Sequence, residues 1–231
     1  MTALDFSVLL RDDAPQMLLH GVVLMLELTG LAWILAMVLG TLLALVRMGR
    51  SQVAQAAVAG WVEYHQNVPM LVQIFLWYFG ISTLLPSGAQ IWLNQHGGEF
   101  AFATISVGLA TSAYVSESLR GGIRAIPASQ VEAARALGLT FLQSFRHVIF
   151  PQAFRISLPT LINHTVLLFK NTSLAMTIGV AELTYATREL ESRSFRTVET
   201  YLFATVVYLA ISLLIMGLGS LAERRLRLAT R

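Results

Sequence analysis

The side chains best suited to contact a polar solute stand inside an otherwise apolar stretch, Ile156–Ala181. Lys170, the only lysine of the chain, lies 14 residues after Ile156 and is followed by Asn171, Thr172 and Ser173. On one continuous helix, Lys170 would lie about 21 Å along the axis at 1.5 Å per residue, which is deeper than the middle of a membrane. A charge at that depth costs roughly 2.5–3.5 kcal/mol and is usually retained for function. These four residues are therefore candidates for a solute path.

Lys170 has two possible roles, and the sequence leaves both open. It could bind the carboxylate of a solute, or it could neutralise a fixed glutamate in a buried ion pair that holds helices together. The possible partners are Glu27, Glu63 and Glu117. Glu27 itself either favours a cationic solute or serves as the structural partner of Lys170, and we favour the second interpretation.

A second polar group precedes the apolar stretch Pro69–Leu85 and consists of Glu63, His65, Gln66 and Asn67. Together with Glu117, which follows the apolar stretch Phe100–Ser116, these residues complete the candidate solute path. His65 could make transport sensitive to pH because histidine titrates near neutrality. A single histidine at a membrane surface is more often solvated.

Catalytic motifs are absent from the sequence. Phe169 precedes the only lysine, so there is no Gly-Lys-Ser/Thr phosphate loop for ATP. No two of the five histidines are four residues apart, no GxSxG elbow occurs, and the chain has no cysteine. We predict no catalytic residue and no metal site, and favour transport or scaffolding. An intramembrane hydrolase is a rival that no spaced motif supports.

Composition predicts a membrane protein. Of 231 residues, 55% are hydrophobic and 13% are charged, which is too little charge for the surface of a soluble domain of this length. A membrane-spanning helix needs about 20 mostly apolar residues. We predict a single all-α domain, residues 1–231, with five spans. The apolar stretches are Leu28–Val46 (extending back to Met17), Pro69–Leu85, Phe100–Ser116, Ile156–Ala181 and Tyr201–Leu221. The second span could begin earlier, with Pro69 as a kink.

The distribution of arginine predicts the orientation of these spans. Five spans place eleven arginines on one side and four on the other, and the side rich in Lys and Arg is cytoplasmic. The N-terminus is then outside and the C-terminus cytoplasmic. The eleven are Arg47, Arg50, Arg120, Arg124, Arg135, Arg146, Arg155, Arg224, Arg225, Arg227 and Arg231; the four are Arg11, Arg188, Arg193 and Arg196. The tail 224–227 is expected at anionic headgroups, and no nucleic-acid partner is expected.

The cytoplasmic link of about residues 121–155 predicts two short helices joined by an elbow. Ser129 with Glu132, and Thr140 with Gln143, have the spacing of capping boxes. Gly138 between them suits the left-handed residue that ends a helix. Apolar side chains at the corner suggest a docking surface for another protein, or the elbow folds back on the spans with Glu132 as a cap. The corner residues are Leu137, Leu139, Phe141 and Leu142.

This link resembles the EAA loop of bacterial ABC-importer permeases. The resemblance rests on Glu132-Ala133-Ala134, on Gly138 six residues after the glutamate, and on Val148, Phe150 and Pro151. Three further motifs resemble the polar amino-acid permeases, and together the likeness covers roughly residues 17–225. They are the stretch from Tyr114 to Gly122, Asn67-Val68-Pro69 with Leu71-Val72-Gln73, and Lys170-Asn171-Thr172-Ser173-Leu174.

The resemblance implies a permease subunit of an ATP-driven importer for polar amino acids in the bacterial inner membrane. Its partners would be a second permease in a homodimer or heterodimer, two ATPase subunits that bind ATP-Mg, and an external solute-binding protein. The coupling residues would be Glu132, Ala133, Ala134, Gly138, Leu139, Thr140 and Phe141. Relatives commonly carry Arg where Gln66 stands, which implies a differently tuned pocket or the non-binding half of a heterodimer. The alternative is a self-sufficient secondary carrier or channel, but neither inverted repeats nor an acid-rich ion path appears.

Overall fold

The computed structural model describes residues 4–226, and within them every regular element is helical. This described part begins with a short 3-10 turn, Phe6–Leu10, and contains ten α-helices linked by 3-10 and π turns. They are α1 Ala14–Met48, α2 Gln52–Asn67, α3 Met70–Phe75, α4 Ser87–Gln95, α5 Gly98–Arg124, α6 Ala128–Ala136, α7 Phe141–Ser144, α8 Phe150–Asn171, α9 Leu183–Ser194 and α10 Thr197–Leu226. The all-α fold class is confirmed.

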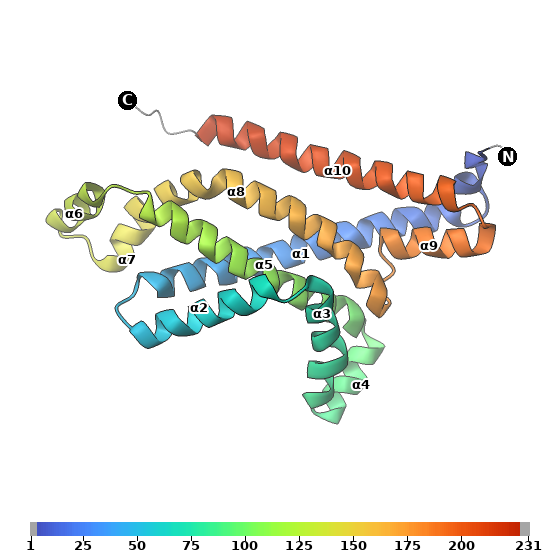
Figure 1. The fold of residues 1–231 in the computed structure, drawn as a ribbon, viewed down its shortest axis with the longest axis horizontal. Helices are drawn as coiled ribbons and strands as arrows, with labels where there is room; N and C mark the ends of the chain where they lie inside the picture. The colour runs from blue at the N-terminus through green and yellow to red at the C-terminus, as the bar shows by residue number, and fades with distance from the viewer. Residues whose placement is uncertain (1–3, 227–231) are drawn as a thin grey trace.

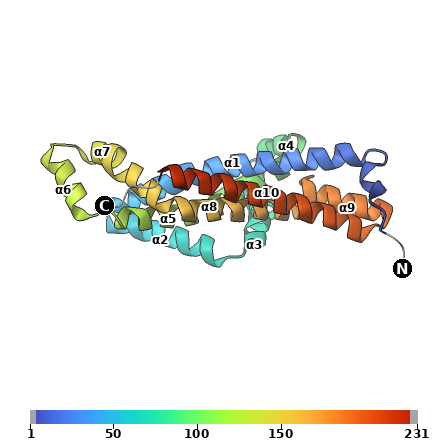
Figure 2. The ribbon, with the colours of Figure 1, turned by 90° about the horizontal axis from the view of Figure 1, so that it is seen from above.

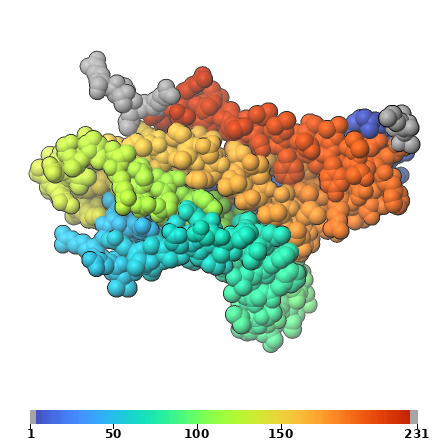
Figure 3. Space-filling model, viewed as in Figure 1, coloured from blue at the N-terminus to red at the C-terminus, as the bar shows by residue number. Residues whose placement is uncertain are grey.

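The long helices α1, α5, α8 and α10 run along the long axis of an elongated bundle (Figure 1). Helix α5 contacts α1, α2, α3 and α8, and so forms the centre of the bundle. Helices α6 and α7 lie at one end, where α10 also finishes, and α9 lies at the other end beside the start of α1 (Figures 1 and 2). The segment from α3 to α4 projects sideways from the bundle (Figure 3).

Small residues allow α1 and α5 to approach closely. Ala32, Ala36, Gly40 and Ala44 recur every fourth residue on one face of α1 and are buried. A Cβ at Gly40 would lie 2.6 Å from Cγ1 of Val115 on α5, closer than real side chains pack. Lipid tails are as apolar as the side chains, so the hydrophobic effect does little to join helices inside a membrane. Close van der Waals packing of this kind holds them together instead.

Two helices, α1 and α10, are long and apolar enough to cross a membrane, each with a mean hydropathy of 2.3. Two bent pairs raise this to four if each pair is one span: α2 with 70–84, bent by 110°, and 141–178 with α9, bent by 50°. Helix α5 contains the third predicted span, but its Ser, Thr and Gly residues leave it less apolar. The count of five therefore stays a prediction.

The second predicted span differs from a single straight helix. The chain bends by 110° between α2 and the segment that begins at Met70. Pro69 stands at the break, as the expected kink requires, since proline cannot continue the helical hydrogen bonds and disfavours helical backbone before it. Beyond α3 the chain continues as a π turn, 76–80, and a 3-10 turn, 81–84.

The elbow confirms one capping box and contradicts the other. Thr140 and Gln143 exchange both hydrogen bonds of a capping box, and Gly138 is left-handed with φ 74°. The box of Ser129 with Glu132 is wrong because Pro127 is the N-cap of α6, so that Ser129 already lies in the first turn. Pro151 occupies the first turn of α8, where proline is tolerated.

The structure also tests where the cytoplasmic link begins and where the basic tail lies. Helix α5 extends to Arg124, so the link begins at Ala125, four residues later than the predicted 121. Arg224 and Arg225 form the last turn of α10, whereas Arg227 and Arg231 lie outside the described residues.

Candidate functional site

The break between α2 and α3 is held by a buried pair of polar side chains. His65 Nδ1 lies 2.6 Å from Gln73 Oε1, and Gln73 Nε2 donates to the carbonyls of His65 and Val68 at 3.1 and 2.7 Å. His65 is 3% exposed and Gln73 is 1% exposed. The expectation of a solvated histidine is therefore wrong. Gln73 pairs with the imidazole and with backbone carbonyls that lose helical partners at the break made by Pro69.

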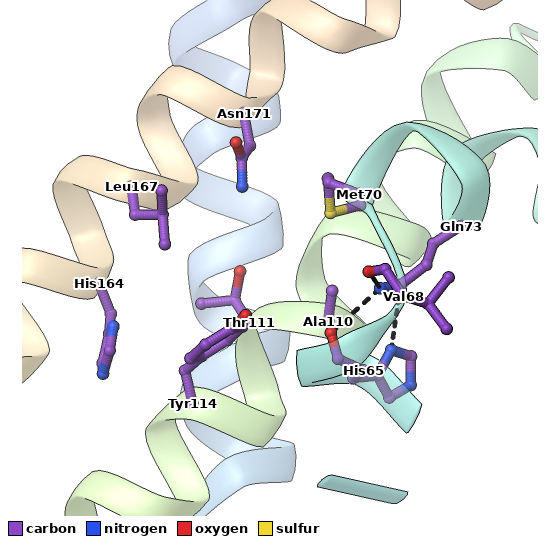
Figure 4. Close-up of a pocket in the computed structure, with 10 residues that line it drawn as sticks. All are labelled: His65, Val68, Met70, Gln73, Ala110, Thr111, Tyr114, His164, Leu167 and Asn171. Carbon is purple, nitrogen blue, oxygen red and sulfur yellow. Dashed lines mark hydrogen bonds between the residues drawn. The ribbon is translucent and has the colours of Figure 1, made fainter. Parts of the chain in front are cut away.

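A polar cleft lies beside this break, between α5 and α8. Figure 4 shows His164, Leu167 and Asn171 on α8 across from Thr111 and Tyr114 on α5, with the break on the third side. Towards the end that carries the elbow, Tyr114 and His164 also line a second cavity. There His164 Nε2 lies 3.0 Å from Ser118 Oγ. The residues lining this second cavity include Gln66, Glu117, Gly121, Gly122, Ser157 and Thr160.

The structure gathers four of the nine candidate path residues at these two cavities: His65, Gln66, Glu117 and Asn171. Glu63 and Asn67 are exposed and occupied with each other, since Asn67 Nδ2 donates to the carbonyl and carboxylate of Glu63 at 2.7 and 3.0 Å. Thr172 is fully buried and donates to the Phe169 carbonyl.

Lys170 and Ser173 line a different cavity, between α8 and α10. Its volume is about 620 Å³, and its polar lining includes Thr184 and Tyr208. Beneath it lies the buried carboxylate of Glu182, which accepts hydrogen bonds from the backbone of Thr184 and Tyr185 and from the Tyr208 hydroxyl at 2.9 Å. Glu182 is thus satisfied without a cation.

The structure contradicts the ion pairs proposed for Lys170. Within residues 4–226, Lys170 is exposed and forms no ion pair. Glu117 instead pairs with Arg120 and, at 3.4 Å, with Arg47, which ties the ends of α1 and α5 together. Glu27 is exposed on α1. Lys170 therefore remains available for a ligand.

Sequence analysis missed Gln73, Tyr114 and His164 as parts of the cleft. Gln73 and Tyr114 lie within motifs that carried the family resemblance, which was the available signal. His164 stood alone in an apolar stretch without a spaced partner, because its partner Ser118 is 46 residues away in the chain.

The elbow projects from the end of the bundle, as Figure 3 shows for α6 at its tip. Leu137 is 80% exposed, and Phe141 and Leu142 are also exposed, as the sequence predicted, whereas Leu139 is half-buried. Glu132 is exposed and has no hydrogen-bond or ion-pair partner in the described chain, so it is not a cap. Leu139 N–H donates to the Ala134 carbonyl at 3.1 Å and closes the turn around Gly138.

No group of three or more His, Asp or Glu residues within 4–226 could hold a metal ion.

Long apolar helices, a polar cleft between them and an exposed elbow at one end define the class of this molecule, which is a multi-pass membrane permease.

The family follows from comparison with known proteins. Residues 22–228 match the family of binding-protein-dependent transport system inner membrane components, and the chain belongs to that family. It is thus a permease subunit of an ABC importer in the inner membrane, as the resemblance of the elbow predicted. The self-sufficient carrier is not favoured.

Individual relatives agree with this assignment. The chain is 34% identical to a nopaline transport system permease of Agrobacterium fabrum over 93% of this chain and 89% of that protein. It is 33% identical to a glutamate/aspartate import permease of Escherichia coli over 85% and 82%. The fold matches a crystallised amino acid ABC transporter at 30% identity and a TM-score of 0.82, covering 97% of this chain and all of the other.

Proposed function

We propose that this chain imports polar amino acids as one permease of an ATP-driven complex. The observation that carries the proposal is the exposed elbow at the end of the membrane bundle. Relatives of the chain are named for nopaline and for glutamate/aspartate transport, which supports the substrate class. The proposed complex contains a second permease, two ATPase subunits that hold ATP-Mg, and an external binding protein. ATP hydrolysis takes place on the ATPase chains.

In the proposed topology the chain crosses the membrane five times, with the N-terminus outside and the elbow in the cytoplasm. The arginine distribution supports this orientation. So does the fold, because α6 and α7 lie at the same end as the C-terminal end of α10 and opposite the first 3-10 turn.

Coupling in this proposal runs through the elbow. The ATPase contacts the corner, and the closing of the ATPase on ATP moves α6 and α7 and so tilts α8, which continues from α7 through the π turn 145–149. The residues assigned to coupling are Glu132, Ala133, Ala134, Gly138, Leu139, Thr140 and Phe141. Glu132 is free to contact the partner.

The corner of the elbow can be tested by co-purification. We expect a Leu137→Asp variant, affinity-purified in mild detergent, to lose its ATPase subunit, since a charge in an apolar contact removes about 2 kcal/mol or more of binding energy. The matched control is Leu10→Asp at the opposite end, because Leu10 is 79% exposed and Leu137 80%. The docking role is wrong if both variants retain the ATPase equally. Co-purification of a second permease with a different sequence would establish a heterodimer.

The substrate path in this proposal uses the cleft between α5 and α8 and the cavity at Lys170. The candidates are His65, Gln66, Glu117, Asn171, Lys170 and Ser173. Glu63 and Asn67 support the break between α2 and α3, and Thr172 supports the 3-10 turn that follows α8. Because Lys170 has no carboxylate partner within residues 4–226, we assign it to the carboxylate that every amino acid carries.

This role predicts a specific transport defect. We expect Lys170→Met to reduce uptake by the reconstituted complex roughly 10–100-fold, which corresponds to a lost charge-assisted hydrogen bond. Lys170→Arg, which keeps the charge, is expected to retain more uptake. The measurement is uptake of radiolabelled glutamate, glutamine and arginine into proteoliposomes. Equal uptake by wild type and Lys170→Met would remove Lys170 from the path.

A further inference from the structure

The inner side of the elbow lines a cavity of about 710 Å³, which shares Leu139 and Phe141 with the residues assigned to coupling. The end of α1, the end of α5, and helices α6 and α7 form its walls. Its lining combines two arginines and a serine with apolar side chains. These residues are Met48, Gly49, Arg50, Ile123, Val131, Arg135, Leu139, Phe141, Ser144 and Ile149.

The polar groups of this cavity lack partners within the described chain. Arg50 and Arg135 form no ion pair and no side-chain hydrogen bond within residues 4–226. Ser144 is only 5% exposed, and its hydroxyl has no hydrogen-bond partner among these residues. A buried hydroxyl without a partner costs about 1–3 kcal/mol. Two guanidinium groups and a free hydroxyl together are suited to an anion that accepts hydrogen bonds.

The position of the cavity identifies the kind of anion. The uncharged stretch of α1 ends at Val46, so Met48 and Arg50 lie where the chain leaves the membrane. Arginine binds phosphate through paired hydrogen bonds, and basic pockets at the ends of membrane helices suit lipid headgroups. The apolar walls include Val131, Leu139 and Phe141. A small hydrated anion would lose hydration against them, whereas the carbon chain of a lipid would be accommodated.

We propose that this cavity binds an anionic phospholipid. The phosphate accepts hydrogen bonds from Arg50, Arg135 and Ser144, and the glycerol and upper acyl carbons contact the apolar wall. The bound lipid links the end of α1 to α6 and α7 and braces the elbow. This site contains none of the substrate-path residues and not Leu137, but it shares Leu139 and Phe141 with the corner of the elbow.

Native mass spectrometry of the full chain in mild detergent tests the proposal. The chain is titrated with phosphatidylglycerol or with phosphatidylcholine, and the bound lipids are counted. We expect one phosphatidylglycerol to bind in preference, and to bind about tenfold more weakly after the double substitution Arg50→Gln and Arg135→Gln. Ser144→Ala should weaken binding by a smaller factor. Because both arginines are exposed, their loss leaves the packed core intact.

The matched control is the double substitution Arg146→Gln and Arg155→Gln. It removes the same charge from exposed positions at the same end of the molecule, outside the cavity. An equal loss of lipid in the control would show general charge attraction and overturn the site, as would unchanged binding by the Arg50/Arg135 variant. A competition experiment adds glycerol 3-phosphate, a soluble compound with the same phosphate group, to the lipid-bound chain. If this compound displaces phosphatidylglycerol at equal concentration, the site binds a free phosphate compound and the lipid assignment is wrong.

Discussion

Replacement of Gly138 by valine is expected to reduce ATP-driven uptake about tenfold, which corresponds to 1–3 kcal/mol of backbone strain. Gly138 has φ 74°, a left-handed conformation that a β-branched residue adopts poorly. An added Cβ would meet nothing within 4 Å, so the strain is conformational and not a clash. The variant relieves that strain by changing the angle between α6 and α7. The membrane bundle does not depend on this angle and is expected to remain folded.

Two controls separate this effect from a general loss of stability. Gly138→Asn should retain most uptake, because asparagine tolerates the left-handed region. Gly60→Val places the same side chain on an exposed helical glycine that also has no neighbour within 4 Å. Uptake and ATP hydrolysis are measured together in proteoliposomes with the ATPase and binding protein. Coupling through this turn is refuted by normal uptake from well-expressed Gly138→Val protein.

The local features of the elbow could be predicted because they depend on neighbouring residues. Gly138 and the box of Thr140 with Gln143 need only a few residues of sequence, and the structure contains both. The box of Ser129 with Glu132 has equally good spacing. It fails because Pro127 starts the helix two residues earlier than a cap at Ser129 would allow. Spacing alone cannot rank two competing helix starts.

The cleft was less predictable because its contacts join distant parts of the chain. Asn171 and His65 were named from composition and motif. Their common cavity depends on how α8 packs against α5 and on the 110° break after α2. One of the two partners of Glu117 was missed for a similar reason: Arg47 lies at the far end of another helix and reaches Glu117 only when α1 and α5 are paired. The other, Arg120, lies three residues further along α5, where spacing alone allows the pair.

A second large effect is expected at Gly122, where α5 packs tightly against α8. A Cβ at Gly122 would clash with Ser157 Oγ and lie 2.5 Å from the Ala153 carbonyl oxygen. The carbonyl belongs to the backbone of α8, so relief requires the two helices to separate. Ser157 also donates to the Ser118 carbonyl at 2.7 Å, and this bond between the helices would be lost as they separate.

Gly122→Ala is therefore expected to destabilise the protein by about 1–3 kcal/mol, the usual cost of overpacking, and Gly122→Leu by more. Gly121→Ala is the matched control, because the adjacent glycine is exposed and its Cβ would have no neighbour within 4 Å. It should be neutral or gain up to about 1 kcal/mol from the better helix propensity of alanine. Thermal unfolding of the purified variants in detergent measures the difference. If both alanine variants unfold at the same temperature, the helices are not in contact at Gly122. The second cavity, which Gly122 and Ser157 line, would then need a different geometry.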